Sequence, residues 1–192
     1  MNTTEKIAQI VAESIAVKTQ LLADNQLLTR LENLASRCAE AFQNGHKIFF
    51  AGNGGSAADA QHLAAEWSGR FYKNRKALFA EALHCNTSYL TAVGNDYGFG
   101  EIYARLVEGW LQKGDILILI STSGNSENIL KAAQQAQKQA VFCVGLTGET
   151  GGELKNCCDL LLNVPSRNTP RIQEAHILLG HILCELVENA VF

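Results

Sequence analysis

The sequence is poor in proline and in charged residues, and each shortage narrows the class of protein. Only 2 prolines occur among 192 residues. No linker or low-complexity segment is visible, which favours one domain over residues 1–192 with a full hydrophobic core. Asp, Glu, Lys and Arg make up 18% of the chain, below the roughly 25% that is usual in globular proteins. Because the hydrophobic fraction of 47% is ordinary, we expect other subunits to cover part of the surface.

A basic surface stripe and a long hydrophobic run are also missing. The formal net charge is −3, which argues against a nucleic-acid partner. One cationic cluster, interpreted as a solvated loop, contains Arg70, Lys73, Arg75 and Lys76. No apolar run approaches the roughly 20 residues that a membrane span needs. The segment 1–6 shows no signal-peptide pattern, so we expect a cytoplasmic protein that does not contact a membrane.

Paired cysteine motifs are absent as well. The chain has 6 cysteines, mostly in apolar segments and without a CxxC pair. This usage is typical of reduced core residues in a cytoplasmic protein. A metal site at the adjacent Cys157 and Cys158 is the alternative, and the lack of a second ligand pair disfavours it.

One phrase, a strand followed by a small polar loop, occurs twice in the chain. The apolar run 47–51 leads into G-N-G-G-S at 52–56, and the apolar run 115–120 leads into S-T-S-G-N-S at 121–126. Each run is typical of a buried parallel strand. A helical pattern follows each loop, and a helix N-terminus directs backbone N–H groups and a positive dipole end at one spot. The sequence therefore predicts a pocket for a phosphorylated or otherwise anionic small molecule.

Strands and helices alternate after an N-terminal helical extension at residues 1–44. The predicted helices cover 4–22, 26–43, 56–69, 87–94, 99–112, 126–138 and 169–191. The predicted strands cover 47–51, 77–83, 115–120, 140–146 and 159–164. This order indicates an α/β fold, a three-layer sandwich whose parallel, flavodoxin-like sheet of about five strands has helices on both faces. Ligands of such sheets bind at the carboxyl ends of the strands, where both loops fall.

His62 and Glu66 follow the first loop at a spacing that places them on one face of a helix. A surface ion pair is the simpler interpretation, and such pairs contribute little to stability. Because the pair starts two turns after a candidate anion loop, we also consider it part of a site.

The last predicted helix is apolar nearly all round, which indicates packing against a partner subunit. It contains Gln173, His176 and His181, which are costly to bury without partners. They are either satisfied inside an interface or share a site with His62 and Glu66. Two histidines, a carboxylate and an amide suit a zinc-like ion. Eight residues, or about 12 Å of axial rise, separate Gln173 from His181, so we expect a neighbouring subunit to complete the cluster.

Two further loops carry weaker signals. Asn95 and Asp96 could line the same pocket, although a turn also favours both residue types. The spacing of Gly52, Gly54 and Ala57 matches a dinucleotide fingerprint, but the next strand ends without the acidic residue that would hold a ribose. We therefore exclude a nicotinamide site and expect no organic cofactor.

Four segments together resemble the phosphoheptose isomerases, a family within the sugar-isomerase (SIS) domain superfamily. They are A-G-N-G-G-S-A-A-D-A-Q-H at 51–62, G-N-D-Y-G at 94–98, S-T-S-G-N-S at 121–126 and R-I-Q-E-A-H at 171–176. The resemblance covers nearly the whole chain and implies a single SIS domain and a homotetramer with a central helical core. It implies an intramolecular oxidoreductase that converts D-sedoheptulose 7-phosphate to D-glycero-D-manno-heptose 7-phosphate. This is the first step toward the ADP- or GDP-activated heptoses of lipopolysaccharide or capsule.

The resemblance also implies roles for individual residues. The substrate-binding set is Asn53, Gly54, Gly55, Glu66, Asn95, Asp96, Ser121, Thr122, Ser123, Ser126 and Gln173. The zinc ligands, one ion per subunit, are His62, Glu66, Gln173 and His181. Glu66 and His181 are also the acid/base pair, and His176 is not a ligand. The chain departs from some relatives at Pro170, where they carry an acidic residue.

The chemistry of these residue types agrees with that reaction. Moving a carbonyl between C1 and C2 needs one base for a carbon-bound proton and an acid for the oxygens of the enediol, and a carboxylate and a histidine can fill these roles. A metal can polarise the carbonyl oxygen. A tightly bound phosphate and a pocket that excludes water limit loss of the enediol intermediate.

Three other functions remain as alternatives. A non-catalytic SIS paralogue that regulates the replication initiator shares the fold, but Glu66 and His181 are both present here. An isomerase of a pentose or hexose phosphate is disfavoured by chain length and by the R-I-Q motif at 171–173. A helical assembly module without catalysis is disfavoured by the two anion loops.

Overall fold

The computed structural model describes residues 2–192 and contains a parallel five-stranded sheet of order β2-β1-β3-β4-β5. Its strands are β1 (Ile48–Gly52), β2 (Ala80–Ala82), β3 (Ile116–Ile120), β4 (Phe142–Thr147) and β5 (Leu160–Asn163). The predicted parallel, flavodoxin-like sheet is confirmed. The strand predicted at 77–83 is shorter than expected, because β2 is an edge strand that pairs with β1 alone.

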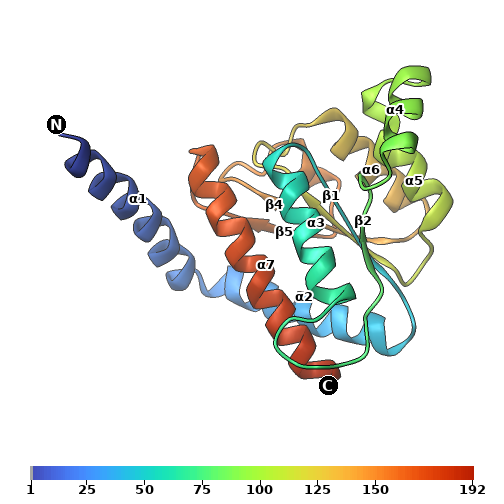
Figure 1. Cartoon of the computed structure of the whole chain (residues 1–192), viewed down its shortest axis with the longest axis horizontal. Coiled ribbons are helices and arrows are strands. Elements are labelled where there is room, and N and C mark those ends of the chain that lie inside the picture. Colours follow the sequence, from blue (N-terminus) through green and yellow to red (C-terminus); the bar gives the residue numbers. More distant parts are fainter. Residues whose placement is uncertain (1) are drawn as a thin grey trace.

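Helices cover both faces of the sheet (Figure 1). One face carries α2 (Asn25–Gln43), α3 (Gly55–Ser68) and α7 (Thr169–Val191), and the other carries α4 (Thr87–Asp96), α5 (Ile102–Trp110) and α6 (Glu127–Lys138). Strand side chains alternate between the faces. Ile48 and Phe50 pack toward α2, α3 and α7, whereas Phe49 and Ala51 pack toward the opposite helices. Short 3-10 turns add η1 (Phe99–Glu101), inside the helix predicted at 99–112, and η2 (Glu153–Asn156), which was not predicted.

The two polar loops lie next to each other because β1 and β3 are neighbours in the sheet. Gly52 at the end of β1 pairs with Ile120 at the end of β3. After β1 the chain moves outward to β2, and it then returns to the other side of β1 as β3. A crevice at such a reversal of strand order is the usual ligand site of an open parallel sheet.

Helices α3 and α7 pack side by side and run in the same direction. At their first turns Gly55 lies against the amide of Gln173. Two turns later Gly180 lies against Leu63, and a Cβ added to Gly180 would lie 2.6 Å from a Leu63 methyl carbon. Because Gly180 has no side chain, the two helices approach closely there.

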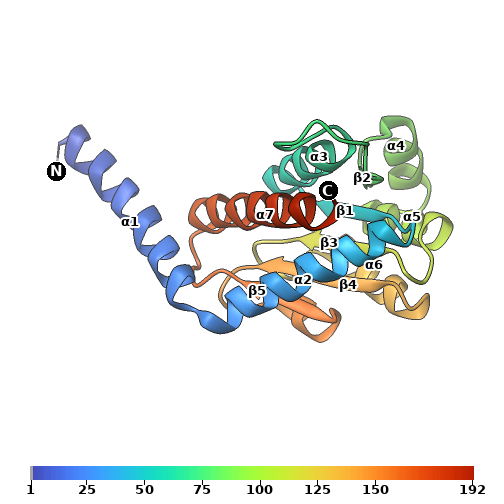
Figure 2. The same ribbon diagram turned by 90° about the horizontal axis from the view of Figure 1, so that it is seen from below.

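Helix α1 (Thr3–Ala23) leaves the body of the domain as an arm (Figures 1 and 2). Ser14 in α1 donates a 2.6 Å hydrogen bond to Glu174 in α7, and Arg171 donates a 3.0 Å bond to the Ile10 carbonyl. The arm exposes a stripe of apolar side chains, Ile7, Val11, Ile15 and Leu22. On α7, expected to be buried nearly all round, Leu186 is 40% exposed. Both surfaces are open in the single chain.

No helix in the part of the chain that the structure describes is long and apolar enough to cross a membrane.

His176 makes the stability of the fold depend on pH. Its side chain is fully buried, and its Nε2 lies 3.1 Å from the Thr147 carbonyl oxygen in β4. Burial lowers the pKa of His176 from 6.5 to about 4. The unfolded chain therefore takes up a proton in a range where the folded chain does not. The stability that neutral His176 contributes is complete above pH 6.5 and is lost as the pH falls toward 4, a total of about 3 kcal/mol.

We expect urea unfolding to show this loss between pH 7.5 and 4.5. His176→Gln keeps an amide donor for the Thr147 carbonyl but cannot titrate, so its free energy of unfolding should vary less over that range. Glu188, whose carboxyl pKa is lowered from 4.5 to about 2, loses its stabilising contribution only below about pH 4.5 and is the same in both proteins, so it does not confound the comparison. Equal pH slopes for the two proteins would contradict the assignment.

Candidate functional site

Three side chains that could bind a metal meet where α3 packs on α7. His62 Nε2 lies 2.9 Å from His181 Nε2 and 3.4 Å from Glu66 Oε1. All three candidate ligand atoms lie within 4.8 Å of one another. His62 and Glu66 share a helix face through their four-residue spacing, and the contact at Gly180 places His181 beside them.

The geometry of this cluster fits an ion of zinc's size. Two tetrahedral ligands at zinc–nitrogen distances would stand about 3.3 Å apart. The separations of 2.9 and 3.4 Å lie on either side of that value. Catalytic zinc sites commonly have three protein ligands drawn from histidine and carboxylate and keep one position open. His62, Glu66 and His181 supply such a set.

Asp59 is a fourth group at the cluster that the sequence did not reveal as functional. It lies one turn before His62 on α3, and its Oδ2 is buried without a hydrogen-bond partner in the described chain. Burial raises the pKa of Asp59, and the nearby His62 and His181 act to lower it. Its i, i+3 spacing from His62 was the signal that could have identified it.

Gln173 lies apart from the three other predicted zinc ligands in the single chain. The Gln173 amide contacts Gly55 at the start of α3. Gln173 itself lies about two turns before His181 on α7. Helices α3 and α7 run parallel and bring His62, Glu66 and His181 together within one chain. That a neighbouring subunit completes the four-residue cluster stays a prediction. That Gln173 is a zinc ligand stays a prediction.

The loop after β3 offers hydroxyl groups and uncapped backbone N–H groups. Ser121 Oγ lies 3.4 Å from Ser126 Oγ and accepts a 3.2 Å bond from Gly124 N, and Ser123 Oγ accepts one from Asn125 N. In the described chain, Ser126 at the N-cap of α6 makes no side-chain capping bond. The first N–H groups of that helix are therefore free for an anion.

A cavity of 260 Å³ adjoins this loop at the carboxyl ends of β3, β4 and β5. Its lining includes Thr122, Ser123, Asn125, Gly148, Thr150, Ser166, Thr169 and Ile172. Gly124, at φ +66°, packs directly on the Gly151 carbonyl, so a side chain at this position would clash with the loop after β4. The lining combines hydroxyl and backbone groups with the exposed ion pair of Arg167 and Glu149, and such groups suit a phosphate or hydroxyl-bearing ligand.

The loop after β1 is tied to α6 by a reciprocal amide pair. Asn53 and the buried Asn128 exchange two hydrogen bonds of 2.9 Å. The Asn53 amide is thus occupied in the single chain. Gly54, at φ +56°, caps α3 without a side-chain bond in the described chain, and Gly55 is exposed beside it. This loop offers a ligand mainly its backbone N–H groups.

Asn95 and Asp96 do not join the cluster within one chain. Both are exposed at the end of α4, where Asn95 Nδ2 donates a 2.9 Å bond to Asp96 Oδ1. Because α4 packs on the sheet face opposite α3 and α7, the structure separates these two residues from the histidines.

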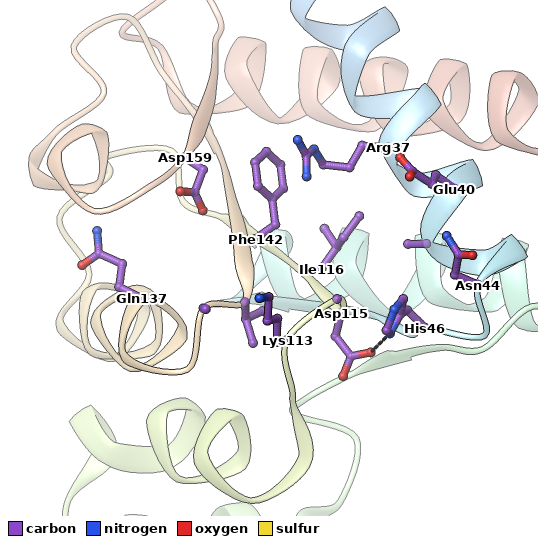
Figure 3. A pocket seen from close by; sticks show the side chains of 14 residues that line it. Arg37, Glu40, Asn44, His46, Lys113, Asp115, Ile116, Gln137, Phe142 and Asp159 are labelled. Atoms are coloured by element: carbon purple, nitrogen blue, oxygen red, sulfur yellow. Dashed lines mark ion pairs between the residues drawn. The ribbon is translucent and has the colours of Figure 1, made fainter.

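The larger cavity, of 620 Å³, lies at the amino ends of the strands (Figure 3). Three acidic residues line it, and two of them, Asp115 and Asp159, already have structural partners, whereas Glu40 is exposed. Asp115 accepts bonds from Lys47 N at 2.9 Å and Gln112 N at 3.0 Å, and Asp159 accepts one from Cys143 N at 2.8 Å. This edge is opposite the polar loops, so the candidate site is the smaller region at the carboxyl ends.

Comparison with known proteins places this geometry in context. The SIS domain family matches residues 11–148. The phosphoheptose isomerase of Aneurinibacillus thermoaerophilus is 51% identical over 182 residues, which are 95% of this chain and 92% of that protein. Solved structures of phosphoheptose isomerases from Neisseria gonorrhoeae and Francisella tularensis are 41% and 37% identical, with TM-scores of 0.92 and 0.94. Each match covers 98% of this chain and 100% of the other.

Helix packing at Gly180 should control metal binding. In Gly180→Ala the new methyl would meet Leu63 and push α3 and α7 apart, which moves His181 away from His62. We expect zinc affinity, measured by calorimetry on metal-stripped protein, to fall by at least about tenfold, as for loss of a supporting contact. The matched control is Gly109→Ala in α5, where nothing lies within 4 Å of an added Cβ. Equal zinc affinities for the two variants would show that this contact does not assemble the cluster.

Proposed function

This chain belongs to the SIS domain family, and we propose that it is a phosphoheptose isomerase that interconverts D-sedoheptulose 7-phosphate and D-glycero-D-manno-heptose 7-phosphate. The observation that carries the proposal is a three-residue cluster in which His62 and Glu66, on the helix that starts at the first anion loop, meet His181 of α7. The reaction is the first step toward activated heptoses for lipopolysaccharide or capsule. A non-catalytic relative would not need a carboxylate and a histidine in contact.

Glu66 and His181 are the proposed acid/base pair. Glu66 has 24% of its side chain exposed. It takes a proton from C1 of the ketose and delivers it to C2 to form the aldose, and it moves the proton from C2 to C1 in the reverse reaction. His181 moves protons at the oxygens of the enediol. A positioned carboxylate and imidazole are effective in such transfers when both reach the substrate.

The proposed phosphate site is the loop after β3. Ser121, Thr122, Ser123 and Ser126 donate hydroxyl hydrogen bonds to the dianion, and the N-terminus of α6 adds backbone donors. Backbone groups of Asn53, Gly54 and Gly55 bind the sugar phosphate from the neighbouring loop. The phosphate anchors the substrate while its reacting end extends toward Glu66.

Zinc, one ion per subunit, is the proposed cofactor. His62, Glu66 and His181 would hold it, and Gln173 would join them or bind substrate if its side chain swings along α7. When bound, zinc supplies Lewis-acid polarisation of the substrate oxygens.

The proposed assembly is a homotetramer of single SIS domains, each comprising residues 1–192, with α1 and α7 forming its helical core. The exposed stripe on α1 and the exposed Leu186 on α7 support this, because apolar surfaces of this kind are usually covered in an assembly. Assembly would also bring Asn95 and Asp96 of a neighbouring subunit to the sugar. We place this tetramer in the cytoplasm, without a nucleic-acid or membrane partner.

A turnover assay on three phosphosugars tests the substrate. Purified, zinc-loaded protein is given sedoheptulose 7-phosphate, fructose 6-phosphate or ribulose 5-phosphate, and aldose formation is followed. We expect kcat/KM to be highest for the heptulose phosphate. A higher value for the hexose or pentose phosphate would assign the enzyme to another SIS isomerase class, and no turnover of any would remove the isomerase proposal.

Glu66→Gln tests the base. The amide keeps the size and hydrogen bonding of Glu66 but cannot accept a carbon-bound proton. We expect a folded protein of unchanged oligomeric state whose kcat is at least about a hundredfold lower. Exchange of the C1 proton with deuterated solvent should fall in parallel. Activity within a few-fold of wild type would exclude Glu66 as the base.

Replacing Ser121, Ser123 and Ser126 together by alanine tests the phosphate site. Because the three hydroxyls are proposed to bind the same phosphate, their loss should weaken binding of the phosphorylated sugar by at least about tenfold, one hydrogen bond to a charged group or more. Inorganic phosphate should compete with substrate in the wild type and compete less in the variant. Unchanged KM and unchanged phosphate inhibition would place the phosphate elsewhere.

A further inference from the structure

A buried ion pair joins the end of α3 to the end of α7. Arg75 Nε donates a 2.7 Å hydrogen bond to Glu188 Oε1, and the two side chains are 2% and 1% exposed. The sequence placed Arg75 in a solvated cationic cluster, and the structure shows instead that it is buried. The two residues lie in the part of the fold that carries Glu66 and His181.

Arg75 caps the C-terminus of α3. Its guanidinium donates bonds of 2.9 Å to the carbonyls of Glu66 and Trp67 and a longer bond to that of Gly69. The last carbonyls of a helix have no partners within the helix. Arg75 satisfies them and so fixes the turn from which the Glu66 side chain projects.

Glu188 binds the loop that follows α3. Its carboxylate accepts hydrogen bonds from the backbone N–H groups of Phe71, Tyr72 and Lys73 at 3.1, 2.8 and 2.8 Å. Burial alone would raise the pKa of Glu188, but these bonds and Arg75 outweigh it and lower the pKa to about 2. The carboxylate is therefore charged at neutral pH and well below it.

The ion pair and the proposed catalytic pair share the same two helices. Glu188 lies seven residues, or two turns, after His181 on α7. The Phe71 ring, on the loop that Glu188 holds, lies 5.8 Å from the His181 ring between centroids. Gly180 sets how close α3 and α7 come, and the ion pair resists sliding or rotation of one helix against the other.

We propose that Arg75 and Glu188 are positioning residues, whose ion pair fixes the last turn of α3 against α7 and thereby sets the separation of Glu66 and His181. The catalytic part of this inference rests on the proposed function. The metal part does not, because the separation of the two side chains also governs zinc binding.

Two variants of the pair and one matched control test the proposal. Glu188→Gln removes the charge, and Arg75→Lys keeps a charge but loses the fork that reaches the α3 carbonyls. The control is Asp115→Asn, which weakens an equally buried carboxylate that binds two backbone N–H groups at the other end of the sheet. Circular dichroism, the urea midpoint and gel filtration report folding and assembly for all proteins.

Zinc affinity by calorimetry is the first readout. We expect both pair variants to bind zinc about ten- to a hundredfold more weakly than wild type, and the control to stay near wild type despite a lowered urea midpoint. The second readout is the split of kinetic constants on sedoheptulose 7-phosphate. In the pair variants kcat should fall while KM changes little, because the phosphate loop lies on other elements.

The outcomes separate this inference from the proposed function. Wild-type zinc affinity and kcat in either folded pair variant would overturn positioning, as would an equal loss in the control. Failure of both variants to fold would reduce the ion pair to a structural role and overturn the inference. If wild type bound zinc but turned over no sugar phosphate, the proposed function would fail while the zinc comparison would still decide positioning.

Discussion

The close parallel contact of α3 and α7 is the constraint on which the site depends. Gly180 lets the helices approach until Leu63 lies where a side chain would be. This approach places His181 2.9 Å from His62. The Arg75–Glu188 ion pair fixes the same two helices two turns further on. A cluster built on rigid helices holds its groups more accurately than one built on loops.

The sheet performs the complementary task of gathering loops at one edge. Reversal of strand order between β1 and β3 puts two glycine-bearing loops side by side, and the Asn53–Asn128 amide pair locks the first loop to α6. At the other edge, the Asp115 carboxylate bonds the backbone at the start of β1 and before β3. The rigid edge and the functional edge are thus separate, as is usual for parallel sheets.

Much of the fold could be predicted from the sequence, because buried parallel strands, glycine-bearing loops and helical periodicity are local patterns. The proximity of His62 and Glu66 follows from helical spacing. The position of His181 beside them could not be predicted in this way, because it depends on the relative direction of two helices that meet through Gly180. Arg75 was misinterpreted because its partner, Glu188, is distant in sequence. Asp59 was missed because its i, i+3 spacing from His62 is common on solvent-exposed helix faces and becomes informative only once His181 is placed beside the same turn.

The central claim is that one chain assembles the proposed acid/base pair, Glu66 and His181, and subunit exchange tests it most directly. Inactive Glu66→Gln subunits are mixed with inactive His181→Ala subunits, and mixed assemblies are verified by native mass spectrometry. Because the structure brings Glu66 and His181 together within a chain, we expect isomerase activity no higher than the sum of the parents. If the pair came from different chains, about a quarter of the sites in a random mixture would be intact. Recovery of activity toward that fraction would contradict the account.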